Sequence, residues 1–364
     1  MMKRLLSIVL VLMLCIIGVG AVSALAEDGA DANFSPMSDV YDAGDKGIDE
    51  KRVEVVSNAV PKGGAGPLFP NTMVGARVWT CKKLDMLKSD KDNSKVLTTI
   101  GAGKRCVITK DYVSNKRICV KYGSYEGWVN TKAVMINLPD VMPEPYVFYN
   151  ITNATGAIYK SSGKDLKNVT GKKLYTGSKN NGKNIAPLMF KTAVKLEKVR
   201  KAALKDGNYL KVYDSYRPWS VTEKLNSGLN AIMGNSTVKN GINSNGYNKA
   251  WFLAQSKSSH NCGAALDITL CDKNGKDCTM PTAMHELSAK ARWQGCSAYK
   301  EWRDKGHKAK YETKDKNSKI KDKDPATKLH NYFVKNGFVY LGSEWWHFQD
   351  NDNMGPKMNF QVGL

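Results

Sequence analysis

After residue 74 the chain alternates hydrophobic and polar positions in short runs, of which Ile118–Tyr122 is typical. Gly, Asn, Asp and Ser residues separate the runs. Alternation over a few residues between turn residues is typical of β-strands. The pattern predicts a small all-β domain over residues 74–138, and its end is marked by Pro139, Pro143 and Pro145.

Residues 146–364 mix two periodicities, which predicts a second, α+β domain. Apolar residues recur near helical spacing over residues 185–206, and Gly207 follows them. Glycine is a good helix C-cap, so we expect a helix that ends there. Residues 209–213 then alternate as a strand.

Two further elements are expected in this domain. Ser220-Val221-Thr222-Glu223 has the pattern of a capping box, which predicts the start of another helix. In Ala264–Cys271 the apolar residues fall on one face, and Asp267 and Thr269 fall on the other. A half-buried strand would therefore point Asp267 away from the core.

The dipeptide Asn274-Gly275 predicts a two-residue hairpin after that strand. This register pairs Cys271 with Cys278, so a cross-strand disulfide is geometrically plausible in an oxidising compartment. The pattern leaves open the connectivity of the other mature cysteines, which are Cys81, Cys106, Cys119, Cys262 and Cys296.

The beginning of the chain has the features of a secretory signal over residues 1–26. Lys3-Arg4 is a basic region, Leu5–Val22 is apolar, and Ala24-Leu25-Ala26 is a small-x-small cleavage site. A single anchoring helix is the alternative, because the apolar run approaches spanning length. Residues 27–73 are rich in Asp, Ala and Gly and predict a flexible leader. No later run of about 18 apolar residues follows, so no further membrane span is expected.

Composition narrows the class of protein. The chain has 364 residues, of which 42% are hydrophobic and 24% charged, as in ordinary globular proteins. Its formal charge of +21 falls to +19 without Lys3 and Arg4. A charge of this size favours the binding of polyanions. For an exported protein these would be envelope polymers or lipid surfaces rather than nucleic acid, although the Lys residues can equally be solvated surface. The Lys-rich residues 304–328 predict an exposed loop.

Two of the five histidines lie in dense polar clusters. His260 precedes Asp267 by seven residues, and His347 follows Glu344 by three. Two His and one Asp suffice for a catalytic zinc that keeps an open position, and a nearby Glu can act as the base for a water. Glu344 and His347 would face opposite sides of a regular strand, so they can share a site only if the segment bends.

Three motifs occur in order: Tyr216-Arg217-Pro218, Ser-x-His-x-x-Gly-x-Ala-x-Asp at residues 258–267, and Glu-Trp-Trp-His-Phe at residues 344–348. Together they resemble the D-alanyl-D-alanine dipeptidases related to the vancomycin-resistance enzyme. These are zinc peptidases of the D-Ala-D-Ala carboxypeptidase and hedgehog-like fold group. The resemblance implies an α+β zinc peptidase domain over residues 146–364.

The resemblance implies one Zn²⁺ per chain with His260, Asp267 and His347 as ligands. It implies Glu344 as general base and then general acid, and Arg217 as the group that faces the reacting carbonyl. A fixed guanidinium can stabilise an oxyanion, and Pro218 biases Arg217 to an extended backbone. Substrate binding or support of the site is implied for Ser258, Asp214, Tyr216 and Trp345.

The chain departs from the family pattern at His285. The dipeptidases place there an acid that holds the free amine of the dipeptide, whereas this chain has His285 followed by Glu286. A substrate without a nearby free amine, such as a peptidoglycan stem peptide, becomes plausible. A shift of one residue that brings Glu286 into the acid's place is the alternative.

The β segment has its own resemblance. Leu84–Ser89, Ser94–Leu97 and Tyr125-Glu126-Gly127-Trp128-Val129 resemble a bacterial SH3-like domain, a small barrel often attached to cell-wall enzymes. A structural module without a ligand is the alternative. We expect residues 74–138 to fold alone and to serve targeting.

These observations predict an exported zinc peptidase, located in the periplasm, cell wall or outside the cell, that cuts D-amino-acid-containing peptides. The alternatives are a stem-peptide carboxypeptidase or endopeptidase, and a cell-wall-binding protein that keeps the fold without catalysis. A weaker alternative is a polyanion-binding surface protein.

Overall fold

The computed structural model describes residues 67–142, 159–166, 185–244, 247–292, 311–312 and 325–362. All of them belong to one compact unit that spans residues 51–364. The predicted signal segment, most of the leader and most of the Lys-rich loop lie outside the described residues. Among the described helices, none has the length and hydropathy needed to cross a membrane.

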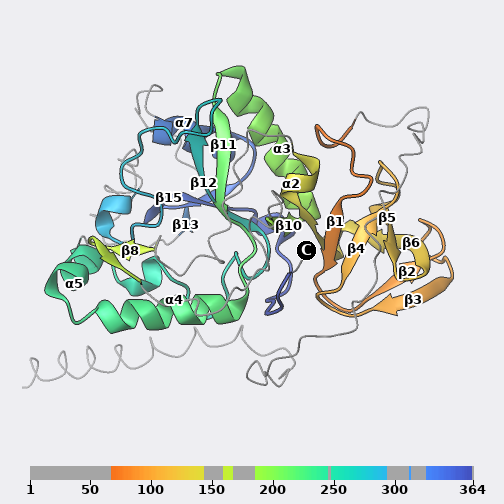
Figure 1. The fold of residues 1–364 in the computed structure, drawn as a ribbon, viewed down its shortest axis with the longest axis horizontal. Helices are drawn as coiled ribbons and strands as arrows, with labels where there is room; N and C mark the ends of the chain where they lie inside the picture. The colour runs from red at the N-terminus through yellow and green to blue at the C-terminus, as the bar shows by residue number, and fades with distance from the viewer. Residues whose placement is uncertain are drawn as a thin grey trace, which may run out of the picture. The chain divides into compact units, whose positions relative to one another are not determined.

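The first sheet contains the predicted β region (Figure 1). Its strands run in the order β10-β7-β1-β4-β5-β6-β2-β3, and every neighbouring pair is antiparallel. Seven come from the β region: β1 (Arg77–Thr80), β2 (Leu84–Leu87), β3 (Val96–Ile100), β4 (Arg105–Ile108), β5 (Arg117–Tyr122), β6 (Tyr125–Asn130) and β7 (Val134–Asn137).

The β region is therefore all-β and antiparallel, as predicted. No pair between its outer strands closes the sheet into a barrel among the described residues, and the SH3-like identity stays a prediction. The packed core includes residues before the expected start of the β region. Phe69 and Met73, assigned above to the flexible leader, are buried, and the ring of Phe69 meets Phe190 edge-on at 6.0 Å.

The first sheet does not end with the β region. Strand β10 (Pro187–Met189) of the second domain pairs with β7, with Leu188 opposite Ile136. At the end of β7, Ala186 exchanges two hydrogen bonds: its N–H donates to Asn137 Oδ1, and its carbonyl accepts from Leu138. This continuity argues against the expectation that residues 74–138 fold alone.

The second sheet carries the predicted chemistry. It has the order β11-β12-β15-β14-β13 and is antiparallel throughout. Its strands are β11 (Tyr209–Asp214), β12 (Ala265–Cys271), β13 (Tyr311–Glu312), β14 (Val339–Leu341) and β15 (Glu344–Gln349). Helix α3 (Phe190–Lys205) packs against β11, and α7 (Pro325–Lys335) packs against β12, β14 and β15 (Figure 1).

Helix α7 covers one face of this sheet. Phe333 of α7 stacks on Phe348 of β15 at 4.1 Å, and Phe348 lies opposite Leu266 of β12. Because side chains alternate along a strand, Asp267 and His347 face the other side. Every residue of β12 is buried, so the expected half-buried strand is wrong. Polar side chains rather than solvent cover the face of Asp267.

The sequence predicts correctly that helices α3 and α4 exist, but it does not predict correctly where they begin. Residues 187–189, expected to be helical, form β10, while the predicted end is confirmed because Gly207 adopts a φ of 71°. Helix α4 (Trp219–Ile232) has Pro218 as its N-cap, so the predicted capping box is not formed. Ser220 N–H instead donates to Asn359 Oδ1.

The remaining described elements are short. They are α2 (Leu138–Val141), α5 (Ser236–Asn243), β8 (Lys160–Ser161), β9 (Lys164–Asp165) and the 3-10 turns η1 (Thr131–Ala133), η4 (Lys249–Trp251), η5 (Ala289–Ala291) and η6 (Asn351–Asn353). Strand β13 and the first turn of α7 fall within residues 304–328, so the expected loop is not irregular throughout.

The predicted hairpin has a different register. Asp272 N–H donates to the carbonyl of Lys276, and Cys271 bridges Asp277 rather than Cys278. This register makes the turn longer than two residues. Within the turn, Asp272 Oδ1 accepts hydrogen bonds from the backbone N–H groups of Asn274 and Lys276. Cys271 and Cys278 are free thiols, and the described cysteines form no disulfide. The expected disulfide between Cys271 and Cys278 is therefore not formed.

The shared sheet generates the first prediction. A chain that begins at Pro143 loses β7, which is the only strand that pairs with β10 among the described residues, and the buried Leu188 and Met189 lose their cover. We expect this truncated chain to be poorly folded and inactive, whereas a chain that begins at Pro67 keeps the complete sheet and folds. Circular dichroism, thermal unfolding and peptide hydrolysis measure the difference. A well-folded, fully active chain from Pro143 would show that the β region is independent.

Candidate metal centre and active site

Strand register brings three polar residues side by side. Asp267 of β12 lies opposite His347 of β15. On its other side, Asp267 lies opposite Asp214 of β11, because a register shift follows Val212. Without this bulge, Tyr213 would stand opposite Asp267 and Asp214 would face the other side. The bulge therefore directs Asp214 to the face of the sheet that holds Asp267 and His347.

A second bulge resolves the difficulty over Glu344 and His347. Phe348 pairs with Tyr340, but the next pair is Glu344 with Leu341, so the three residues between them have no partner in β14. This bend brings Glu344 Oε2 to 3.8 Å from His347 Nδ1. The condition set by the sequence, that the segment must bend, is met.

His260 reaches the site from the turn that precedes β12. Gly263 closes this turn with a φ of 63° and donates its N–H to the carbonyl of His260. A side chain at Gly263 would also lie 2.7 Å from the sulfur of Met135 on β7. Both constraints favour glycine at this position. Ser258 supports the turn from the other end, since its Oγ accepts from His260 N–H.

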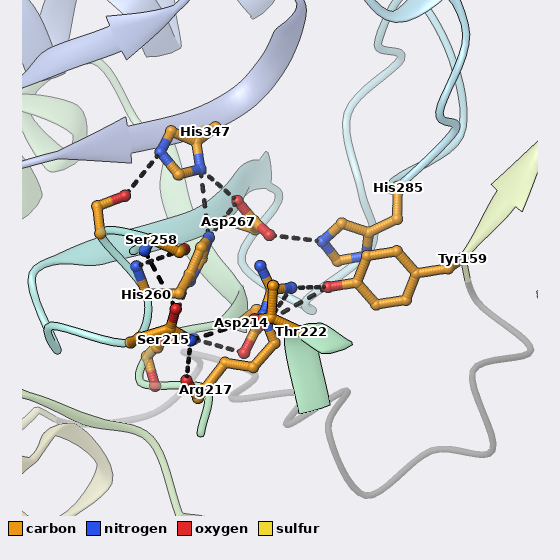
Figure 2. A network of polar contacts seen from close by, with 12 residues as sticks. Tyr159, Asp214, Ser215, Arg217, Thr222, Ser258, His260, Asp267, His285 and His347 are labelled. Carbon is orange, nitrogen blue, oxygen red and sulfur yellow. Dashed lines mark hydrogen bonds and ion pairs between the residues drawn. The ribbon is translucent and has the colours of Figure 1, made fainter. Parts of the chain in front are cut away.

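The ligand atoms converge on one point (Figure 2). Asp267 Oδ1 lies 3.2 Å from His260 Nε2 and 3.1 Å from His347 Nδ1, and the two nitrogens are 3.2 Å apart. Ligands about 2.0 Å from a tetrahedral zinc ion are about 3.3 Å from one another. All three side chains are buried, so the site fits a small cation.

Outer hydrogen bonds decide which atoms are free for a metal. His260 Nδ1 lies 2.7 Å from the carbonyl of Ser215, which can only accept, so Nδ1 carries the hydrogen. His347 Nε2 lies 3.2 Å from the amide oxygen Oε1 of Gln349, which also only accepts, and 3.4 Å from the hydroxyl of Ser259, which can accept as well. In the neutral rings, His260 Nε2 and His347 Nδ1 therefore present lone pairs to each other and to Asp267. Three converging lone pairs repel unless a metal ion, or a proton on one of the two rings, lies between them, so this arrangement favours a metal centre.

The local electrostatics suit this purpose. Burial raises the pKa of Asp267, but the neighbouring His260, His285 and His347 outweigh it and hold the pKa well below its usual range. Burial lowers the pKa of His347, which keeps its ring neutral. An ionised carboxylate and neutral imidazoles are the forms that bind zinc.

Arg217 lies beside this cluster in a buried network (Figure 2). One guanidinium nitrogen donates to Asp214 Oδ2 at 3.0 Å and to the hydroxyl of Tyr159. Burial lowers the pKa of Arg217, but Tyr159 and Asp214 outweigh it and raise the pKa, so the guanidinium stays charged. Asn261 holds the same segment, since its Nδ2 donates to the carbonyl of Arg217.

Sequence reasoning missed Tyr159, Asn261 and Gln349. Asn261 lies within the His260 motif and Gln349 lies two residues after His347, so their positions carried a signal. Tyr159 precedes every motif, and nothing in its neighbouring sequence distinguishes it.

The other predicted site residues have different surroundings. Trp345 is buried and donates from Nε1 to Thr282 Oγ1 at 3.0 Å. Tyr216 is not brought into the cluster: its hydroxyl donates to the carbonyl of Phe360 and accepts from the N–H of the same residue. The function proposed below therefore does not use Tyr216.

His285 and Glu286 each have a partner within the chain. His285 is 1% exposed, and its Nε2 lies 3.0 Å from Asp267 Oδ2. Glu286 Oε1 accepts from Ser162 N–H at 2.6 Å, in the turn between β8 and β9. Substrate contact by His285 stays a prediction. In the structure, its Nε2 contacts Asp267, which is itself a candidate metal ligand.

Comparison with protein families gives a match over residues 164–362, to the family described as D-ala-D-ala dipeptidase. This range is more than half of the chain and contains all three candidate ligands, Glu344 and Arg217. The chain belongs to the D-Ala-D-Ala dipeptidase family. It is a metallopeptidase-family enzyme with a His-Asp-His candidate zinc site. No curated protein matched the chain significantly. Tyr159 lies before the range that matches the dipeptidase family.

The convergent lone pairs generate the second prediction. We expect His260→Gln and His347→Gln to lose stoichiometric zinc, because each variant removes one of the three ligands on which the zinc affinity depends. His330→Gln is the matched control, since His330 is similarly buried but meets the ring of Tyr340 edge-on, away from the cluster. Metal analysis after dialysis measures zinc per chain. Full zinc retention in both ligand variants would contradict the assignment.

Proposed function

We propose that this protein is an exported zinc peptidase that hydrolyses D-amino-acid-containing peptides of the D-Ala-D-Ala type in peptidoglycan metabolism. The observation that carries the proposal is the convergence of His260, Asp267 and His347 beside Glu344 in a dipeptidase-family domain. Zinc bound there would polarise the peptide carbonyl and make water a better nucleophile.

Glu344 is the proposed base. Glu344 is 6% exposed, and its Oε2 lies 3.8 Å from Nδ1 of His347, a candidate ligand atom. It is therefore close enough to the proposed metal position to take a proton from the attacking water and to return one to the leaving amine.

Arg217 is the proposed oxyanion partner. Asp214 and Tyr159 orient its guanidinium, and the paired carboxylate compensates for the burial of its charge. A preoriented cation in a buried site stabilises negative charge that develops on the carbonyl oxygen. The presence of both Glu344 and Arg217 at the site favours catalysis over the alternative of a cell-wall-binding protein without activity.

The surroundings of His285 and Glu286 favour a substrate longer than the free dipeptide. The dipeptidases use an acid there to hold a free amine, but Nε2 of His285 is directed to Asp267 and Glu286 accepts from the β8–β9 turn. We therefore propose a stem peptide, cut by a carboxypeptidase or endopeptidase reaction. The predicted signal over residues 1–26 supports export, and the β region is the proposed wall-binding part.

The proposed base generates the third prediction. Glu344→Gln should keep zinc and fold but lose about 10²- to 10⁴-fold in kcat, as expected when a positioned base is removed. Glu223→Gln, on the exposed side of α4, is the matched control and should keep its activity. Rates are measured on a peptide ending in D-Ala-D-Ala together with zinc content. Wild-type turnover by Glu344→Gln would place the base elsewhere.

The fourth prediction concerns substrate length. A charge-assisted bond to the substrate amine contributes a few kcal/mol when it is desolvated. Without it, we expect free D-Ala-D-Ala to be cleaved with a lower kcat/KM than an N-acylated peptide that ends in D-Ala-D-Ala.

Product analysis by mass spectrometry on the two substrates measures this preference. Glu286→Gln should leave the preference unchanged. A preference for the free dipeptide that disappears in Glu286→Gln would assign the acid's role to Glu286 and make the protein a free dipeptidase.

A further inference from the structure

The two oxygens of the Asp267 carboxylate have separate tasks. Oδ1 lies within 3.2 Å of both His260 Nε2 and His347 Nδ1, whereas Oδ2 lies 3.0 Å from His285 Nε2 (Figure 2). An ionised carboxylate only accepts hydrogen bonds, so His285 Nε2 must carry the hydrogen. Its other nitrogen, Nδ1, is buried without a hydrogen-bond partner among the described residues. This agrees with a ring that donates from Nε2 alone.

His285 is held firmly for this contact. Its ring stacks on Tyr159 with centroids 4.4 Å apart and planes 16° from parallel, and Trp346 meets it edge-on at 5.6 Å. The backbone is fixed as well. The carbonyl of His285 accepts from Lys160 N–H, and the carbonyl of Lys160 accepts from Leu287 N–H.

The backbone of His285 is itself unusual. Its φ is 60°, a left-handed conformation that is uncommon in residues other than glycine. Such a conformation persists only where the surroundings enforce it. Here the enforced backbone aims the ring at Asp267, and the strand that enforces it, β8, lies before the range that matches the dipeptidase family.

We propose that His285 is a positioning residue for the metal centre, which acts through Asp267 rather than on the substrate. This rests on the metal centre of the proposed function. Donation to Oδ2 fixes the rotation of the carboxylate about its last bond, so that Oδ1 alone faces His260 Nε2 and His347 Nδ1, the atoms that would hold the metal with it. Hydrogen bonds to the outer atoms of metal ligands are worth about 10- to 100-fold in metal affinity.

The test compares two variants of equal length, His285→Gln and His285→Met. Both give up the ring stack and place a straight side chain on the same backbone, but only Gln offers an N–H donor near the position of Nε2. Metal-free proteins are titrated with zinc against a chelator, and the visible spectrum of the Co²⁺ forms reports on ligand geometry. His330→Met is the control for loss of a buried histidine elsewhere.

We expect His285→Met to bind zinc about 10-fold or more weakly than His285→Gln, with an altered Co²⁺ spectrum. His330→Met should match the wild type. Equal zinc affinities and equal spectra in the two His285 variants would overturn the positioning role while leaving the proposed function intact. Failure of the wild type to bind stoichiometric zinc would overturn the metal centre itself.

A second pair keeps the proposal testable if the His285 variants do not fold. Tyr159→Leu removes the ring that stacks on His285, whereas Tyr159→Phe keeps the ring and removes only the hydroxyl that contacts Arg217. We expect Tyr159→Leu to bind zinc several-fold more weakly than Tyr159→Phe. Equal zinc affinities in this pair would also contradict a positioning role for the Tyr159–His285 stack.

Discussion

The site depends on one buried, ionised carboxylate. Burying an unpaired charge costs several kcal/mol, so Asp267 can remain ionised inside the sheet only if its oxygens are fully used. Two imidazoles face Oδ1 and a third faces Oδ2. A cation at the point where the lone pairs of His260, His347 and Asp267 converge would complete the compensation. The need to compensate this buried charge therefore favours a metal ion at the candidate site.

Irregularities in the sheet bring the polar groups to this carboxylate. A regular antiparallel register would turn Asp214 and Glu344 to the wrong face, and a bulge in each of β11 and β15 corrects this. The bulges leave the neighbouring pairs Leu266–Phe348 and Val212–Ile268 in register, so the core beneath stays closed. The hydrophobic face of the sheet therefore stays regular, and the two bulges change only which side chains lie on the face with Asp267.

The ligands also depend on parts of the chain outside the catalytic sheet. The turn that carries His260 rests on Met135 of β7, and Met189 of β10 donates its N–H to the carbonyl of Gly263. The β region thus supports the back of the metal loop. On the other side, β8 holds His285 against Asp267. Two segments that precede the matched dipeptidase range therefore contribute to the geometry of the site.

The sequence by itself determined the α+β class, the two regions, the C-terminal end of α3 and the set His260, Asp267, His347, Glu344 and Arg217, because these depend on local periodicity and on motifs a few residues long. It also predicted that the segment must bend for Glu344 and His347 to share one site. The tertiary structure decided the surroundings. The register of β11, β12 and β15, the longer hairpin that separates Cys271 from Cys278, the shared β7–β10 pair and the contact of His285 with Asp267 all join residues distant in sequence. Their geometry is set by packing and by the satisfaction of buried polar groups, and no local pattern encodes it.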